Sequence, residues 1–201
     1  MGLHNTTFLM IKLFKRKLSD WLWRDREKHF TGSVLDRLRG LDPVLASCRD
    51  TKVLDVTSSD GLISYEFFRR GAALIHGIER NRFSLRIARY IFADVPIPSR
   101  FIEADLAIGS RSLDAAIGSQ LLPSYDIVLF LGIYHHLIGQ MSAESLEELV
   151  KFFMSRSTCW FVVRTDLMEP VAKLAAANGF SLHSVEPKKA DIGLLHVYIK
   201  S

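Results

Sequence analysis

The chain has 201 residues, of which 48% are hydrophobic and 24% are charged. This composition excludes a disordered or low-complexity chain and predicts one globular domain with a substantial core. The two cysteines, Cys48 and Cys159, lie far apart and lack the spacing of metal ligands, so we expect reduced thiols, no metal and a cytoplasmic protein.

The sequence indicates neither a membrane span nor a secretory signal. The longest uncharged stretch, residues 127–143, is too short to cross a bilayer and contains two histidines. The N-terminus lacks the apolar core and cleavage site of an export signal. Residues 1–40 hold nine Lys or Arg and four Asp or Glu, a net of +5, whereas the whole chain carries +4, which leaves −1 for residues 41–201. The basic character therefore belongs to an N-terminal arm.

We expect residues 1–45 to form this basic helical arm and residues 46–201 to form the main domain. The apolar side chains of the first arm helix recur at the 3/4 spacing of an amphipathic helix: Ile11, Phe14, Leu18 and Leu22. A second helix is predicted from Gly32 to Leu41. Pro43 is then expected to open a short connection toward the first strand.

From residue 52 onward, short apolar runs alternate with segments of helical periodicity. The runs predict seven strands, at 52–56, 74–78, 100–104, 125–131, 159–164, 180–185 and 194–199. Alternation of strands and helices implies a parallel sheet with helices on both faces, an α/β fold. The last two runs are joined by "EPKKADIG", which is too short for a helical crossover, so we expect them to pair as antiparallel neighbours.

Two of the predicted helices have clear caps. Asn81 caps a helix over residues 81–92, and Ser142 caps a helix over residues 142–154. In the first helix we expect an apolar face of Phe83, Ile87 and Ile91, with Leu85 and Ala88 nearby, and a solvent face of Arg82, Arg86 and Arg89.

Acidic residues stand at the ends of three successive predicted strands. Asp55, Glu79 and Asp105 would meet at one edge of the sheet, where open α/β sheets bind ligands. Gly61 opens the helix after the first strand and offers backbone donors to an anionic group. A carboxylate at Glu79 suits the two hydroxyls of a ribose, and Asp105 suits an adenine amino group. Glycines for a pyrophosphate are missing, so the set fits an adenosine ligand without one.

Over about residues 50–200 the chain resembles the class I S-adenosylmethionine-dependent methyltransferases. Their first motif, hydrophobic-Leu-Asp-hydrophobic-Gly-x-Gly-x-Gly, is matched by "VLDVTSSDG", and their later acids by "IHGIER" and "EADLA". The resemblance implies a Rossmann-like, seven-stranded mixed sheet of order 3-2-1-4-5-7-6, with strand seven antiparallel. Within the family, "DVTSSDGLISYEFFRRGA" and "YDIVLFLGIYHHL" are most similar to the subgroup that contains the wobble-uridine carboxymethyltransferases of tRNA.

The resemblance also implies S-adenosylmethionine as the cofactor. The positions it assigns to cofactor binding are Asp55, Thr57, Ser58, Ser59, Gly61, Glu79, Asp105, Leu106, Leu131 and Gly132. Thr57 replaces the first motif glycine, and Ser59 is a milder departure. With a negative φ, Thr57 is able to donate its hydroxyl to the methionine carboxylate, together with Ser58 and Ser59. Asp55 and backbone carbonyls are the expected acceptors for the ammonium group.

His135 and His136 follow the fourth strand, at the rim where a substrate would enter. Either is a candidate general base for a methyl acceptor, and the alternative is that they cap or pack against the next helix. The Asn/Asp-Pro-Pro-aromatic run of the enzymes that methylate exocyclic amines is replaced by "LGIYHH". The resemblance therefore favours an oxygen acceptor on a small molecule, a saccharide or a lipid-linked metabolite.

Several alternatives stay open at this point. The arm, and residues 9–30 in particular, would be a lid over the cofactor cleft, a contact with an anionic membrane surface or a contact with RNA phosphates. The protein would accordingly be cytoplasmic or peripheral to a membrane. An RNA-modifying methyltransferase is one alternative function. A non-catalytic module with the same fold is another, and Thr57 favours it.

Overall fold

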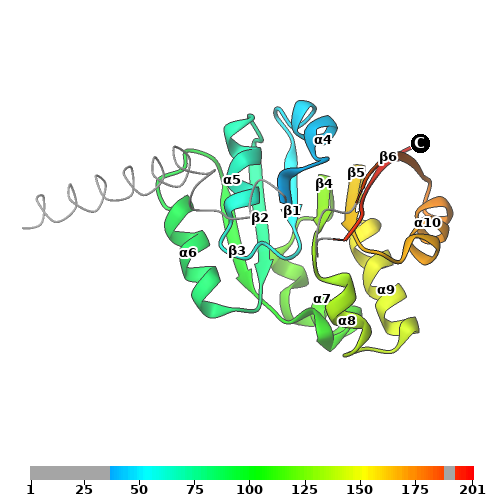
Figure 1. Ribbon diagram of the computed structural model, residues 1–201. Helices are drawn as coiled ribbons and strands as arrows, with labels where there is room; N and C mark the ends of the chain where they lie inside the picture. The colour runs from blue at the N-terminus through cyan, green and yellow to red at the C-terminus, as the bar shows by residue number, and fades with distance from the viewer. Residues whose placement is uncertain (1–36, 188–192) are drawn as a thin grey trace, which may run out of the picture. The chain divides into compact units, whose positions relative to one another are not determined.

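The seven predicted strands form one sheet in the computed structural model, which describes residues 37–187 and 193–201 (Figure 1). Residues 1–36, which hold most of the predicted arm, lie outside the described residues. The described sheet and its helices belong to a compact unit that begins at Leu38. Residues 38–45, which we had assigned to the arm, are part of this unit.

The strand order is β3-β2-β1-β4-β5-β7-β6, as the sequence predicted. β7 pairs antiparallel with both β5 and β6, and the other neighbours pair in parallel. The strands are β1 (Lys52–Asp55), β2 (Leu74–Glu79), β3 (Ser99–Glu103), β4 (Tyr125–Phe130), β5 (Ser157–Arg164), β6 (Phe180–Glu186) and β7 (Leu195–Lys200). From β1 the chain adds β2 and β3 on one side of the sheet and then continues with β4 on the other side. The carboxyl ends of the parallel strands β1 and β4 therefore form the topological switch point, where ligands bind in such folds.

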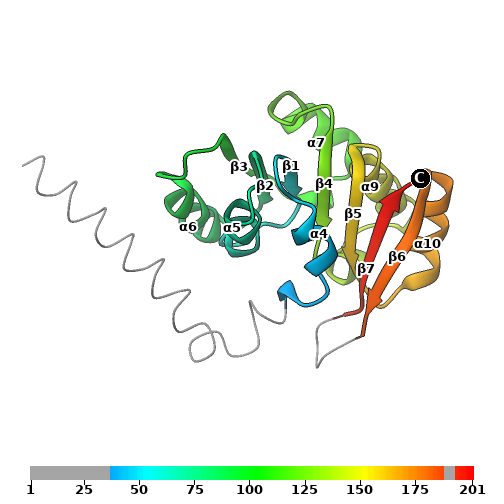
Figure 2. The same ribbon diagram turned by 90° about the horizontal axis from the view of Figure 1, so that it is seen from above.

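Helices cover both faces of the sheet, as Figure 2 shows from above. One face carries α4 (Asp42–Ala46), α5 (Leu62–Arg69) and α6 (Arg82–Phe92). The other carries η1 (Leu106–Ile108), α7 (Ser110–Ile117), η2 (Gly118–Gln120), α8 (Tyr134–Ile138), α9 (Ala143–Met154) and α10 (Met168–Ala177). Successive strand residues alternate between the two cores: Val53 packs on the α5 side and Leu54 on the α9 side.

The connection before β1 differs from the one we predicted. The described part of the expected helix 32–41 is helical only at residues 37 and 38, and a turn follows at Arg39 and Gly40. Gly40 has φ +80°, which ends a helix. Pro43 does not open a connection but stands in the first turn of α4, where its missing N–H costs nothing.

The expected apolar face of α6 was also wrong in one respect. Phe83 is 72% exposed, whereas Leu85, Ala88 and Phe92 are buried against the sheet. Residues 83, 87 and 91 recur every four positions and drift around the helix, while 85, 88 and 92 follow the 3.6-residue repeat more closely. Both predicted caps are confirmed: Asn81 accepts from two backbone amides of α6, and Ser142 accepts from the amide of Ser145 in α9.

The described residues contain no helix long and apolar enough to cross a membrane. Across the same ranges, 37–187 and 193–201, no group of three or more His, Cys, Asp or Glu side chains is arranged to hold a metal ion. Both cysteines are free thiols, and Cys48 is buried.

Candidate cofactor site

The turn between β1 and α5 is tied to the strands on both of its sides. The amide of Val56 donates to the carbonyl of Leu129 in β4 at 2.9 Å, and the amide of Ser58 donates to that of Ile78 in β2 at 3.0 Å. The hydroxyl of Thr57 donates to the carbonyl of Leu131 at 2.6 Å. The turn therefore bridges three neighbouring strands at the switch point.

Gly61 ends this turn in the left-handed conformation, with φ +79°, and immediately precedes α5. A Cβ at this position would lie 3.0 Å from the Cβ of Ala88 in α6. A glycine is required here for two reasons, its backbone angle and the close approach of α6. Its amide donates to the carbonyl of Ser58 at 2.8 Å.

The second left-handed residue of the turn is Ser59, with φ +48°. Thr57 is not among the residues with positive φ, so its β-branched side chain carries no such strain. The family motif has glycine at both positions, and only the second of them needs the left-handed conformation here. This explains how the turn accommodates Thr57.

Asp55 lies beneath the turn rather than in the cleft. Its side chain is 1% exposed and accepts a hydrogen bond from the hydroxyl of Ser64 at 2.7 Å. Burial raises the pKa of this carboxyl to about 6, against the opposing effect of hydrogen bonds from Ser64 and from the backbone of Thr57. The geometry makes Asp55 an anchor for the start of α5, and its expected role as an acceptor for an ammonium group stays a prediction.

Glu79 ends β2 and faces the turn. One carboxylate oxygen accepts from the amide of Ser59 at 3.0 Å, and the other accepts from the amide of Asn81 at 2.6 Å. Each oxygen of an ionised carboxylate has a second acceptor position, so both are still able to accept from a diol. Glu79 thus fixes the turn and keeps capacity for a ribose.

A small cavity of about 70 Å³ adjoins Glu79. Its lining residues come from the ends of β1, β2 and β3 and from the segment around α8: Val56, Thr57, Ile78, Glu79, Arg80, Ala104, Asp105, Leu106, Ile133, Leu137 and Gln140. Pockets for whole ligands usually reach about 300–1,000 Å³, so this cavity encloses only part of a ligand. Apolar walls with acids at the edge suit a flat heterocycle.

Asp105 and Arg80 stand together at the edge of this cavity. The guanidinium of Arg80 lies 3.8 Å from the Asp105 carboxylate, and both side chains are about half exposed. The other Asp105 oxygen accepts from the amide of Ala107 and caps η1. Asp105 was expected to end β3 but lies two residues after it, as the N-cap of η1, and Arg80 was missed. Its position directly after Glu79 could have indicated that Arg80 also lies at this edge of the sheet.

The remaining predicted cofactor residues have mixed positions. Leu106 lines the cavity. Leu131 contributes its carbonyl to Thr57, and Gly132 has φ +70° with open space around it. The hydroxyl and amide of Ser58 both point at the carbonyl of Ile78. The hydroxyls of Thr57 and Ser58 and the amide of Ser59 therefore donate within the protein.

The two histidines lie on α8, above the carboxyl end of β4. Both are exposed, with ring centroids 3.9 Å apart. Partial burial and the neighbouring His136 lower the pKa of His135, and Asp166, which follows β5, opposes the shift. His135 is therefore neutral near pH 7. Sequence reasoning missed Asp166, which no motif distinguishes.

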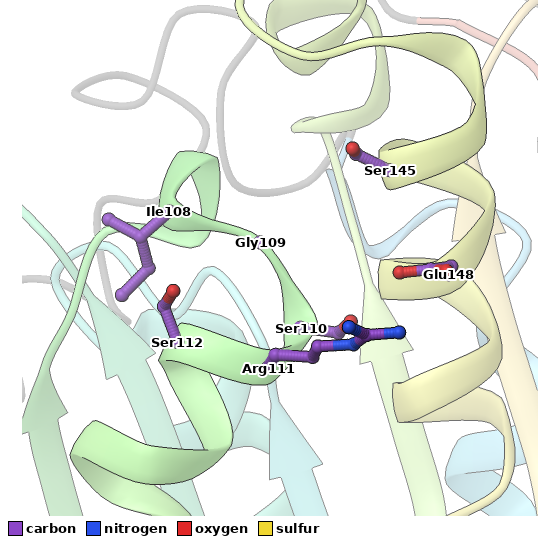
Figure 3. Close-up of a pocket in the computed structure, with 7 residues that line it drawn as sticks. All are labelled: Ile108, Gly109, Ser110, Arg111, Ser112, Ser145 and Glu148. Carbon is purple, nitrogen blue, oxygen red and sulfur yellow. The ribbon is translucent and has the colours of Figure 1, made fainter.

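A second, wider hollow of about 260 Å³ lies between α7 and α9. Figure 3 shows Arg111 extending from the first turn of α7 toward the α9 side, which carries Ser145 and Glu148. The other lining residues are Ile108, Gly109, Ser110 and Ser112. No predicted site residue lines it, and its side chains carry charges of both signs.

No family model and no curated protein matches the sequence. The fold, in contrast, matches many solved structures. A TehB-like S-adenosylmethionine-dependent methyltransferase from Corynebacterium glutamicum superposes with a TM-score of 0.60 at 13% identity, covering 94% of this chain and 98% of that one. TehB from Haemophilus influenzae gives 0.63 at 10% identity, covering 90% and 66%.

A further similar structure comes from Pyrococcus horikoshii and is described as a candidate RNA methyltransferase. Its TM-score is 0.58 at 14% identity, over 85% of this chain and 82% of that one. At these identities the comparisons establish the fold. The chain has the Rossmann-like fold of the S-adenosylmethionine-dependent methyltransferases, with strand order and antiparallel β7 as in that fold.

Proposed function

We propose that this protein is an S-adenosylmethionine-dependent methyltransferase that acts on an oxygen acceptor. The observation that carries the proposal is the Glu79 carboxylate, which stands at the end of β2 beside a cavity with apolar walls, with Asp105 two residues after the neighbouring β3. Because β2 and β3 are parallel neighbours, both acids lie at the same edge of the sheet and beside the same cavity. The fold adds support, because the solved structures that share it include proteins described as S-adenosylmethionine-dependent methyltransferases.

The residues present fit the adenosine part of the cofactor. Glu79 has acceptor capacity for the ribose hydroxyls, and the free acceptor positions of Asp105 suit an exocyclic amino group. Leu106, Ile133 and Leu137 provide apolar contact for the ring. When bound, the cofactor supplies an electrophilic methyl group on a sulfonium.

The acceptor side of the site is formed by α8 and the loop after β5. His135, neutral near pH 7, is able to take a proton from an acceptor hydroxyl, and His136 is its alternative. Asp166, which favours the protonated form of His135, would stabilise the resulting cation. We propose an oxygen acceptor on a small molecule, a saccharide or a lipid-linked metabolite, in keeping with "LGIYHH" after β4. We also propose that, among these methyltransferases, the protein is most similar to the subgroup that contains the wobble-uridine carboxymethyltransferases of tRNA.

One specific observation favours a second candidate, a binding module that has kept the fold without the chemistry. Three of the donors near the expected methionine carboxylate are engaged within the protein: the Thr57 hydroxyl with Leu131, the Ser58 hydroxyl with Ile78 and the Ser59 amide with Glu79. A zwitterionic ligand end would have to displace these bonds or find other donors. A module of this kind would bind a partner and need no cofactor.

Isothermal titration calorimetry of the full chain with S-adenosylmethionine and S-adenosylhomocysteine separates the two candidates. We expect saturable heat with both compounds, because the adenosine contacts are common to them. A folded protein that gives no heat with either compound at about millimolar concentration, equivalent to less than about 4 kcal/mol of binding, would exclude the enzyme and leave the binding module.

A further inference from the structure

α6 presents an unusual outer face. The helix buries Leu85, Ala88 and Phe92 against the sheet, and its opposite side faces solvent. Figure 1 shows α6 at the end of the sheet that carries β2 and β3. The apolar stripe of α6 is therefore buried in the core. A ligand of the outer face would contact polar and aromatic side chains instead.

Arginines dominate this outer face. Residues 80–93 contain four arginines and no Asp, Glu or Lys. Arg82, Arg86 and Arg89 recur at the i, i+4, i+7 positions that share one side of a helix, and all three are exposed. Arg82 is the first residue of α6, where the helix dipole favours acids over cations. Local helix stability thus does not explain the arginine at this position.

The charge of this face is only partly compensated. Arg82 is paired with Glu103 at 2.7 Å, so one cation has an anionic partner. Arg89 donates to the backbone carbonyl of Phe101, which fixes the side chain but carries no charge. Arg86 is exposed and follows Phe83 by three positions, so the two side chains are neighbours on the helix surface.

Phe83 is 72% exposed, more than any other large hydrophobic side chain that the structure describes. It lies in the first turn of α6, four residues after Glu79, and Arg86 is its neighbour one turn further along the helix surface. An exposed aromatic ring beside an arginine row matches the way proteins hold single-stranded nucleic acids, in which bases stack on aromatic rings and cations contact the phosphates.

We propose that the outer face of α6, formed by Arg82, Phe83, Arg86 and Arg89, binds single-stranded RNA. A membrane surface fits the face less well, because an interfacial helix inserts an apolar stripe and that of α6 is buried in the core. Arginine rather than lysine also suits phosphate and base contacts, since its planar guanidinium both bonds and stacks. The proposal goes beyond the methyltransferase function and does not depend on it.

Fluorescence anisotropy with a labelled, unstructured RNA of about 12 nucleotides tests the proposal on the full chain at low salt. Phe83→Ala removes the stacking surface and is expected to weaken binding by about fivefold or more. Arg86→Glu is expected to weaken binding and to lower the salt dependence of log K by about 0.7 for the phosphate contact it removes. Both side chains are exposed, so neither change should unfold the protein.

Two exposed residues elsewhere serve as matched controls. Leu182→Ala changes a 51% exposed hydrophobic side chain in β6, and Arg49→Glu reverses an exposed arginine before β1. Both should bind the RNA as the wild type does. All four variants should also keep the wild-type response to S-adenosylmethionine in calorimetry, which separates this surface from the cofactor site.

The proposal fails if the wild type does not bind the RNA. It also fails if Phe83→Ala or Arg86→Glu binds as well as the wild type, which is the result expected if the basic arm alone contacts RNA. Equal affinity for a duplex of the same sequence would contradict stacking on unpaired bases. Binding to anionic vesicles that Phe83→Ala abolishes, without RNA binding, would assign the face to a membrane instead.

Discussion

The hydroxyl of Thr57 and the carbonyl of Leu131 form a 2.6 Å hydrogen bond between residues 74 positions apart in the chain. The bond joins the turn after β1 to the segment after β4, at the point where the strand order reverses. A glycine, which the family motif places at position 57, has no side chain to make it. The structure thus gives the Thr57 hydroxyl a structural role in joining these two segments.

Thr57→Gly is expected to lower the free energy of unfolding by about 1–2 kcal/mol, from the lost hydrogen bond and the added freedom of the unfolded chain. The affinity for S-adenosylmethionine should stay the same or rise, because the hydroxyl is not available to the ligand. Urea unfolding and calorimetry on the same samples provide both values. Thr57→Ser, which keeps the hydroxyl, is the control and should behave nearly as the wild type. If the glycine variant is fully folded and still binds the cofactor more weakly, the Thr57 hydroxyl contacts the ligand.

Glu79→Ala is expected to weaken S-adenosylmethionine binding by about 1.5–3 kcal/mol, roughly tenfold to a hundredfold, because it removes a carboxylate acceptor from the ribose position. Glu103→Ala is a matched control: Glu103 is aligned with Glu79 on the next strand, but its carboxylate pairs with Arg82 on the surface. Calorimetry should show a loss for the first variant and none for the second. Equal affinities in the two folded variants would remove Glu79 from the ribose site.

The sheet could be predicted from the sequence because its determinants are local. Alternating apolar runs specify strands, the lengths of the connections separate parallel from antiparallel pairs, and the family resemblance adds the order. The same reasoning placed Glu79 and Asp105 at one edge, since the carboxyl ends of neighbouring parallel strands meet there. These two positions follow from the fold alone.

The contacts of the turn could not be predicted in the same way. Whether the hydroxyl of Thr57 faces a ligand or the carbonyl of Leu131 depends on the spacing of β1 and β4, which no residue of the turn encodes. Asp55 shows the same difficulty, because its motif position does not reveal that Ser64 lies within hydrogen-bond distance. Hydrogen bonds between distant segments form only once the sheet has set their separation.

Gly61→Ala is expected to destabilise the protein by about 2–4 kcal/mol, through a left-handed backbone angle and a tight contact of the added methyl group with Ala88 at 3.0 Å. Gly132→Ala separates the two causes. Gly132 has φ +70° but nothing within 4 Å of an added Cβ, so only the backbone cost of about 1–2 kcal/mol should appear. Urea denaturation of both variants gives the comparison. Equal losses would show that α6 moves away from position 61 without cost.

Two buried groups are expected to act in opposite directions on stability as the pH changes. The pKa of Asp55 is raised to about 6 from 3.8, so its protonated form stabilises the fold at low pH, and this contribution is lost as the pH rises through about 6. The pKa of His76 is lowered by burial to about 4 from 6.5, so its contribution is present above 6.5 and lost as the pH falls. Between about pH 4 and 6 the two largely cancel.

Asp55→Asn should remove the contribution of Asp55 to the pH dependence of the unfolding free energy. The amide keeps an oxygen that accepts from Ser64 but does not ionise, so the variant gains stability relative to the wild type as the pH rises from about 4 to 6, by up to about 3 kcal/mol. Above about pH 7 the difference should stay constant. Urea unfolding of both proteins across this range measures the difference directly, and the other titrating groups cancel in it. A difference that does not vary with pH would mean that Asp55 is no harder to ionise in the folded protein than in the unfolded chain, and that its burial beneath the turn costs nothing.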